Sequence, residues 1–395
     1  MALITTSAAA LKRLHLTRKP EFDALRGLFL VWMTLTHLPT RMSDLVNQPF
    51  GFVSSAEGFV FLSALLVGRV YMRQALENTG SLRTRLWKRA LKVYAYHLTL
   101  LLLAFTFAAA FAVVRHRAAL ENLLDFYLAH PGVAVIGSLL LIYCPPLLDI
   151  LPLYVIFLVA SPLAFTIAVR RGWRPVLVCS SIMWLLAQFH LRIWVHQLVT
   201  QATHLPIPLQ ETGAFDLFAW QWVWIMGMWL GARSLEGELP LRHIPHWGRW
   251  ASGAVCVFFL GVRHNWWGQH LTQQSLGMLL DKWQVAPLRL LNLVAFVIVL
   301  YGLRSAVRWL IAREPFITLG RASLEVFCAH LLFVFIGLAL LYGEVPQLHG
   351  IYALALLTVT FLALIYVAQR QVRRRHKDKQ PRAPLPAQMV DTAPL

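Results

Sequence analysis

An arginine and a histidine with ten residues between them lie in the first long apolar segment of the chain, FDALRGLFLVWMTLTHLP. The imidazole of His37 can act as a general base near neutral pH, and the guanidinium of Arg26 can bind phosphate or carboxylate groups. In a helix, eleven residues of about 1.5 Å separate the two by about 16 Å and bring them to nearly the same face. The alternative is an arginine that snorkels from a helix end and a histidine that is hydrogen-bonded within a bundle.

A carboxylate in the second apolar segment lies at a similar depth to this histidine. Glu57 is about five residues into GFVSSAEGFVFLSALLVGR, and the connection between the two segments is short. An unpaired carboxylate is costly inside a membrane. We therefore expect Glu57 to bind His37, orient the imidazole and raise its basicity. The alternative is that Glu57 bonds Ser54 or Ser63 and has a purely structural role.

Cations gather at the opposite end of the apolar segments. Arg69 and Arg321 lie within their segments, and a basic stretch from Arg83 to Lys92 follows the second segment. Arg321 and Glu325 are four residues apart, which is the spacing of an intrahelical ion pair. Guanidinium groups without a counter-ion suit phosphate or carboxylate ligands, although such residues can also simply set membrane topology. The predicted binding residues for an anionic ligand are Arg69, Arg321, Arg85 and Arg89.

A second set of polar and aromatic residues could bind the other substrate. Asp216 and Trp220 begin the segment FDLFAWQWVWIMGMWLGA, where a carboxylate beside an aromatic ring suits a stacked sugar. Tryptophan is also common at membrane interfaces, which is the simpler explanation for most of the tryptophans here. Ser63 and Glu325 are added as candidate substrate-binding residues because polar groups inside apolar segments usually face a cavity or a partner.

The composition shows what kind of protein must position these residues. Of the 395 residues, 58% are hydrophobic and 14% are charged, and the mean hydropathy is +0.59. Soluble domains are about 45–50% apolar and about 25% charged, so this composition indicates an all-α, polytopic membrane helix bundle. The net charge of +18 fits cytoplasmic loops rich in lysine and arginine better than nucleic-acid binding. No metal site is predicted, because the nearest motif, His243-x-x-His246, contains a proline.

Ten apolar segments are long enough to be membrane spans. They are residues 22–42, 52–72, 91–114, 149–169, 175–194, 215–232, 249–263, 287–304, 319–342 and 350–370. Most lysines and arginines then lie on one side, which predicts that both termini are cytoplasmic. Residues 132–146 are too short to span and are predicted to be an outer re-entrant or interfacial helix. The predicted organisation is a basic N-terminus (1–20), a membrane domain (21–370) and a disordered basic, proline-rich tail (371–395).

The motifs that carry these residues resemble the membrane acyltransferase-3 superfamily. The similarity rests on Arg26-x10-His37, on the run EGFVFLS that ends at Ser63, on the basic stretch before Lys92, and on SLE…H at 323–330. Within the superfamily, EFDALRG…THLP, GFVSSAEGFVFLS and DILPLY are similar to the OpgC family of periplasmic glucan succinyltransferases. The resemblance covers about residues 21–370, and it departs from the superfamily pattern at Ala64, where glycine is usual.

This resemblance implies an enzyme of the bacterial inner membrane that needs no tightly bound cofactor. Its partners would be cytoplasmic acyl-CoA, with succinyl as the expected acyl group, a periplasmic glucan acceptor and the lipid bilayer. It also implies that Arg26 and His37 are essential. With the residues above, it predicts a polar tunnel that joins the arginine end to His37, which acts as general base. The alternatives are an acetyltransferase acting on an exopolysaccharide or lipopolysaccharide, or a non-enzymatic carrier of glycan or lipid.

Overall fold

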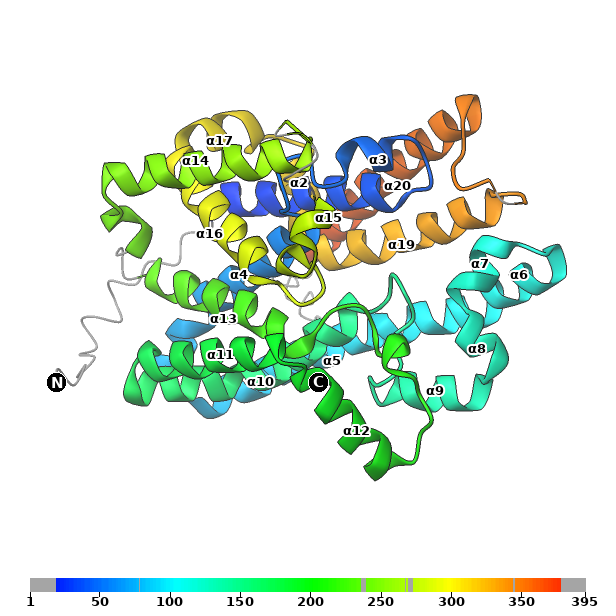
Figure 1. The fold of residues 1–395 in the computed structure, drawn as a ribbon, viewed down its shortest axis with the longest axis horizontal. Helices are drawn as coiled ribbons and strands as arrows, with labels where there is room; N and C mark the ends of the chain where they lie inside the picture. The colour runs from blue at the N-terminus through cyan, green and yellow to red at the C-terminus, as the bar shows by residue number, and fades with distance from the viewer. Residues whose placement is uncertain are drawn as a thin grey trace, which may run out of the picture.

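The computed structural model describes residues 19–77, 79–235, 239–266, 268, 273–343 and 345–377. Within these ranges the chain forms helices, and its extended pairing is limited to an isolated bridge between Thr40 and Leu348 (Figure 1). The predicted all-α fold is confirmed. The predicted N-terminal segment up to residue 18 and the tail beyond residue 377 lie outside the described residues.

The helices have the following bounds. In chain order they are α2 (Pro20–His37), α3 (Met42–Val46), α4 (Ser55–Glu77), α5 (Thr79–Leu103), the π-helical turn η1 (Ala104–Ala108), α6 (Ala109–Arg115), α7 (Ala118–Leu123), α8 (Asp125–Ala129), α9 (Pro131–Leu139), α10 (Ile150–Arg171), α11 (Trp173–Gln188), α12 (Leu191–Thr203), the 3-10 turn η2 (Leu209–Thr212), α13 (Leu217–Arg233), η3 (Pro240–His243), α14 (His246–Arg263), α15 (Gln273–Leu276), η5 (Gly277–Leu280), α16 (Pro287–Gly302), α17 (Arg304–Ile311), α18 (Phe316–Arg321), α19 (Ser323–Leu340) and α20 (Gly350–Lys377).

Five helices of the described chain are long and apolar enough to cross a membrane, or up to seven if each of two bent pairs counts as one span. The five are Ser55–Glu77, Gly80–Arg115, Ile150–Arg171, Ser323–Leu340 and Gly350–Lys377. The prediction of a polytopic membrane helix bundle is confirmed. The other predicted spans also overlap helices, but these are shorter, bent or more polar. Helix α2, for example, carries Glu21, Asp23 and Arg26 in its eighteen residues.

The predicted span 175–194 is wrong as a single straight helix. Helices α11 and α12 meet at an angle of 85°, and His190 adopts a left-handed conformation with φ of 64° at the break. Two polar side chains of α12 form hydrogen bonds with the segment that follows this helix. Arg192 donates to the Thr212 hydroxyl at 2.7 Å, and the His196 ring lies 2.8 Å from the Ile207 carbonyl oxygen. Residues 132–146 contain α9, which has nine residues and is too short to cross a bilayer.

Helix α20 extends beyond the predicted boundary at residue 370. It continues through Lys377, so the first part of the predicted disordered tail is helical. Arg375 in this extension donates to the carboxylate of Glu325 at 2.9 Å and to the carbonyl oxygen of Arg321 at 2.8 Å. These contacts with α18 and α19 explain why the last turns of α20 remain folded.

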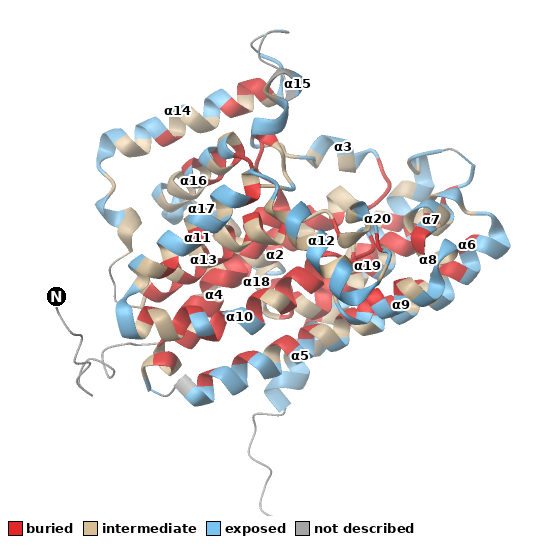
Figure 2. Cartoon of the chain, turned by 60° about the horizontal axis from the view of Figure 1, so that its bottom comes forward, coloured by how far each residue is buried: buried red, intermediate tan, exposed pale blue. Residues whose placement is uncertain are grey.

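The buried core is formed mainly by α2, α4, α10, α13 and α19, whereas α12 and α17 contain no buried residue (Figure 2). Helices α2 and α18 pack especially closely through two glycines. A Cβ on Gly27 would overlap the backbone carbonyl of Phe316, and a Cβ on Gly320 would overlap the carbonyl of Asp23. This close approach brings Arg26 and Arg321, the neighbours of the two glycines, to the same end of the bundle.

Replacing Gly320 with alanine is expected to destabilise the protein by about 1–3 kcal/mol, because the new methyl group forces α18 away from rigid backbone on α2. Thermal unfolding of purified protein in detergent measures this effect. Gly253→Ala on α14 is the matched control, since its Cβ meets nothing within 4 Å and alanine favours a helix. Equal unfolding temperatures for the two variants would contradict the close packing of α2 and α18.

Candidate functional site

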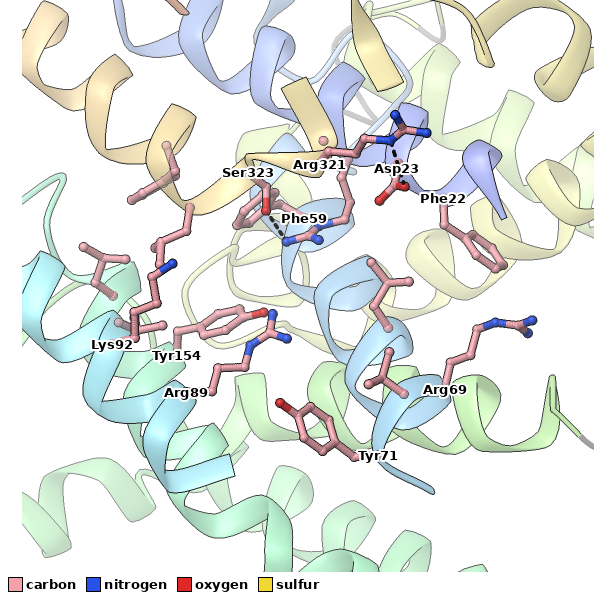
Figure 3. A pocket seen from close by; sticks show the side chains of 18 of the residues that line it. Phe22, Asp23, Phe59, Arg69, Tyr71, Arg89, Lys92, Tyr154, Arg321 and Ser323 are labelled. Carbon is pink, nitrogen blue, oxygen red and sulfur yellow. Dashed lines mark hydrogen bonds and ion pairs between the residues drawn. The ribbon is translucent and has the colours of Figure 1, made fainter. Parts of the chain in front are cut away.

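A strongly basic cavity of about 630 Å³ opens near the N-terminal end of α2, between α2, α4, α5, α10 and the α18–α19 junction (Figure 3). We call it the arginine cavity. The cations that line it are Lys19, Arg26, Arg69, Lys88, Arg89, Lys92, Arg321 and Arg375. Among the described lining residues, Asp23 is the one carboxylate. An excess of guanidinium and ammonium groups of this size is suited to a ligand with several negative charges.

Arg26 and Arg321 enter the arginine cavity from the two close-packed helices. Arg26 donates to the hydroxyl of Ser323, and its guanidinium lies 5.9 Å from the centre of the Phe59 ring. The guanidinium of Arg321 lies 3.9 Å from the carboxylate of Asp23. Both arginines therefore lie where the sequence predicted a basic cluster.

The predicted ion pair between Arg321 and Glu325 is wrong. Helix α18 ends at Arg321 and α19 begins two residues later, so the two residues do not share the continuous helix that their spacing requires. The buried Glu325 carboxylate accepts from Lys92 at 3.0 Å and from Arg375 at 2.9 Å. Because Glu325 is occupied by these two cations and is not part of the cavity lining, the structure gives no support to its predicted role in substrate binding.

Three of the four predicted donor-binding arginines line the arginine cavity. They are Arg69, Arg89 and Arg321. Arg69 donates to the Ser234 hydroxyl at 2.9 Å, and its guanidinium is directed away from Arg89 (Figure 3). Arg89 lies between Tyr71 and Tyr154, whose hydroxyls interact with it. Arg85 is exposed and does not line the cavity.

A second cavity, of about 500 Å³, lies at the C-terminal end of α2. We call it the histidine cavity because His37 lines it. Polar and aromatic side chains make up much of its wall, including Trp32, Asp149, Lys282 and Trp283. Arg26 and His37 therefore line two cavities. They lie toward the two ends of one helix, which is the separation that ten intervening residues predicted.

A chain of hydrogen bonds fixes the imidazole of His37. Nδ1 of His330 lies 2.5 Å from the carbonyl oxygen of Phe327, which can only accept, so this nitrogen carries the proton. In a neutral His330 ring, Nε2 is then the acceptor, and it lies 3.3 Å from Nδ1 of His37. Nδ1 of His37 must donate, and its Nε2 keeps a free lone pair. The network therefore leaves His37 with the tautomer that can accept a proton at Nε2.

The predicted contact between Glu57 and His37 is wrong. The fully buried carboxylate of Glu57 forms an ion pair with Arg289 on α16 and accepts a hydrogen bond of 2.7 Å from the Ser54 hydroxyl. The alternative of a structural bond to Ser54 is thus the one that the structure contains. Ser63 is also fully buried, lines neither cavity, and its hydroxyl has no hydrogen-bond partner among the described residues.

Asp216 and Trp220 do not form a surface on which a sugar could stack. The carboxylate of Asp216 caps α13 by accepting from the backbone amides of Phe218 at 2.8 Å and Ala219 at 3.2 Å. Trp220 is fully buried and donates through Nε1 to the carbonyl oxygen of Trp283 at 3.0 Å. The predicted sugar contact is therefore wrong for this pair, because helix capping and packing occupy both side chains.

Two adjoining cavities lie along the course of the predicted tunnel. Ile150 and Phe327 line both cavities, so the two cavities meet at these two buried side chains. The Phe327 ring stacks against Phe59 at a centroid distance of 5.9 Å and contacts the His330 ring at 4.9 Å. Buried apolar side chains therefore line the junction between the arginine cavity and the histidine cavity.

Comparison with known proteins agrees with this membrane-embedded architecture. A family model described as OpgC protein matches residues 18–376, which is nearly the whole chain. The chain belongs to the OpgC family. No curated protein matches the chain, and no solved structure does. Membership in the OpgC family supports a membrane protein that modifies glucans, and the family name suggests an enzyme of the acyltransferase type.

Two residues of the OpgC chain that matter for the histidine cavity were missed as site residues. His330 is the histidine of the SLE…H motif at residues 323–330. Like His37, it is a titratable residue inside an apolar segment, and this could have marked it as a candidate site residue. Lys282 lies in the loop between η5 and α16, where no periodic pattern marks it. Its position on the cavity wall depends on how this loop folds over the bundle.

Replacing Glu57 with glutamine is expected to destabilise the OpgC chain by about 3–5 kcal/mol, because the buried Arg289 guanidinium loses its counter-ion. Thermal unfolding in detergent measures the loss. The double variant Glu57→Gln/Arg289→Met is expected to be less destabilised than the sum of the single variants, since it leaves no unpaired charge. Additive losses would contradict a structural ion pair.

Proposed function

We propose that this OpgC protein is an integral membrane O-acyltransferase that moves a succinyl group from cytoplasmic succinyl-CoA to a hydroxyl of a periplasmic glucan. The observation that supports it best is the pairing of a basic cavity and a histidine cavity at opposite ends of α2. The distribution of lysine and arginine predicts that the basic end faces the cytoplasm. Donor and acceptor would thus approach the reacting atoms from opposite sides of the membrane.

The arginine cavity is suited to the phosphate groups of coenzyme A. Arg26, Arg89 and Arg321 offer planar donors that can bind phosphate oxygens in pairs, and Lys88 and Lys92 add positive charge. The narrow pantetheine arm would then pass between Ile150 and Phe327 toward His37. Under this proposal the arginines bind and orient the donor and do not take part in the bond changes.

In the proposed reaction, Nε2 of His37 accepts the proton of the sugar hydroxyl as its oxygen attacks the thioester carbonyl. The new carbon–oxygen bond forms, the carbon–sulfur bond breaks, and the departing thiolate receives the proton from His37. His330 acts as a positioning residue, because it accepts from Nδ1 and thereby keeps Nε2 available. Such general base catalysis is worth about 10²–10⁴ in rate.

Direct transfer is favoured over an acyl-enzyme intermediate. Ser63 and Cys328, whose residue types would allow a nucleophilic role, are both buried and line neither cavity. Cys144 lines the histidine cavity, but it is buried and its thiol donates to the carbonyl oxygen of Leu141 at 3.8 Å. A nucleophile must reach the thioester carbon, which the proposal places in front of His37. The sugar hydroxyl is therefore the nucleophile in this proposal.

The proposal is tested with membranes that contain the protein and purified glucan, given isotope-labelled succinyl-CoA in one assay and isotope-labelled acetyl-CoA in a parallel assay. The expected product is a glucan ester whose mass increases by one succinyl group and whose added carboxylate increases retention on an anion exchanger. Membranes without the protein are the control. Movement of glucan with no incorporated label would contradict an enzyme and support a carrier, and incorporation of acetyl alone would contradict the succinyl donor.

A further inference from the structure

Lys282 is a cation of the histidine cavity that the proposed reaction does not yet use. It lines this cavity together with His37, and the two side chains are close enough for their charges to interact. Within the described chain, the ammonium group makes no ion pair, although it lies 4.6 Å from the centre of the neighbouring Trp283 ring. An ammonium group in a partly buried position of this kind gains most from an anionic ligand.

The loop that carries Lys282 is held firmly by the surrounding helices. The carbonyl oxygen of Trp283 accepts from Nε1 of Trp220 and from the backbone amide of Asp216, both at 3.0 Å. Nε1 of Trp184 on α11 donates to the Val285 carbonyl, also at 3.0 Å. The residues that were expected to bind a sugar thus position this loop, and Lys282 is held on the cavity wall before any ligand binds.

Burial and the neighbouring charges act on the pKa of Lys282 in opposite directions. Burial lowers the pKa of Lys282 from its ordinary value, whereas the negative charges of Glu57 and Asp149 raise it and Arg289 lowers it. Glu57 is already paired with Arg289, and the Asp149 carboxylate accepts from the Ala214 backbone amide at 3.0 Å. The pKa of Lys282 is lowered overall, and the two carboxylates, whose own main contacts are to other groups, limit this lowering.

We propose that Lys282 binds the free carboxylate of a dicarboxylic acyl group and thereby selects a succinyl donor over a neutral one. This inference rests on the proposed acyl transfer. When the thioester carbon lies in front of His37 and the pantetheine arm extends back toward the arginine cavity, the acyl chain must point into the histidine cavity. The distal carboxylate of a succinyl group, three carbon–carbon bonds farther on, then lies within the cavity whose wall carries Lys282.

The test compares succinyl-CoA with butyryl-CoA, which has the same chain length and a methyl group in place of the carboxylate. Initial rates of ester formation on glucan give kcat/KM for each donor. We expect Lys282→Met to lower the ratio of succinyl to butyryl transfer by roughly 10–100-fold, because a hydrogen bond to a charged group is lost. Lys282→Arg is expected to keep most of the preference, since it keeps the charge. Arg115→Met, on the exposed end of α6, is the control and should leave the ratio unchanged.

The outcomes separate this inference from the proposed function. If the wild-type protein transfers succinyl groups but Lys282→Met keeps the same donor ratio, the inference fails and the proposed function stands. An equal loss for both donors in Lys282→Met and in Lys282→Gln overturns the inference as well, because it indicates a role in folding or in the bond changes. If the wild-type protein transfers neither acyl group, the proposed function fails and the inference fails with it.

Discussion

Replacing His37 with alanine is expected to lower acyl transfer by about 10²–10⁴-fold while the protein remains abundant in the membrane. The variant loses the nitrogen that the His330 hydrogen bond leaves free to accept the hydroxyl proton. The structural cost is small, because His37 is only half-buried and loses a single hydrogen bond, worth about 1 kcal/mol. Transfer of labelled succinyl groups to glucan, normalised to the amount of protein, measures the effect.

His349→Ala is a matched control for this prediction. His349 is exposed and lies in the connection just before α20, outside the lining of either cavity. This variant should transfer acyl groups at the wild-type rate. Full residual transfer by His37→Ala would refute the assignment of His37 as the general base, whatever the identity of the donor and acceptor.

Replacing Phe327 with tryptophan is expected to lower acyl transfer by roughly 10–100-fold, because the larger ring narrows the junction of the two cavities through which, in the proposed function, the donor arm passes. Overpacking of this kind costs about 1–3 kcal/mol, and about 1.4 kcal/mol corresponds to a tenfold change in rate. Binding of coenzyme A should persist, since the arginines of the arginine cavity are unchanged. Transfer rates and coenzyme A-induced shifts of the unfolding temperature distinguish the two effects.

Two further variants show whether the loss of acyl transfer is specific to a larger ring at Phe327. Phe335→Trp enlarges another buried ring on α19 that lines neither cavity, so it should reduce stability without reducing transfer in the folded protein. Phe327→Leu removes part of the ring from the junction and should retain transfer. Equal transfer by Phe327→Trp and wild type would show that the donor does not pass between these side chains.

The helices could be predicted from the sequence because hydrophobic runs of bilayer length are a direct physical signal. Each predicted span overlaps a helix, and the spacing of Arg26 and His37 correctly places them at the two ends of α2. The break at His190 could not be predicted in this way. It depends on a left-handed residue and on partners that Arg192 finds in a loop about twenty residues away.

The pairing of charges within the site was much harder to predict than the positions of the charges. Glu57 was assigned to His37 because the two lie at similar depth, but its partner is Arg289, 232 residues away in the sequence. Glu325 was assigned to Arg321 because a continuous helix was assumed where the chain breaks between α18 and α19. A buried carboxylate must find a cation, but which cation lies close enough is decided by helix packing.

The two buried apolar side chains at the junction of the cavities, Ile150 and Phe327, bear on the electrical insulation of the bilayer. A continuous hydrated passage between the two cavities would conduct protons and small ions, and hydrophobic constrictions stop such conduction by excluding water. Ile150 and Phe327 are buried where the two cavities meet, and an apolar junction of this kind resists the entry of water. A chemical group could then cross the membrane on a slender carrier while ion gradients are preserved.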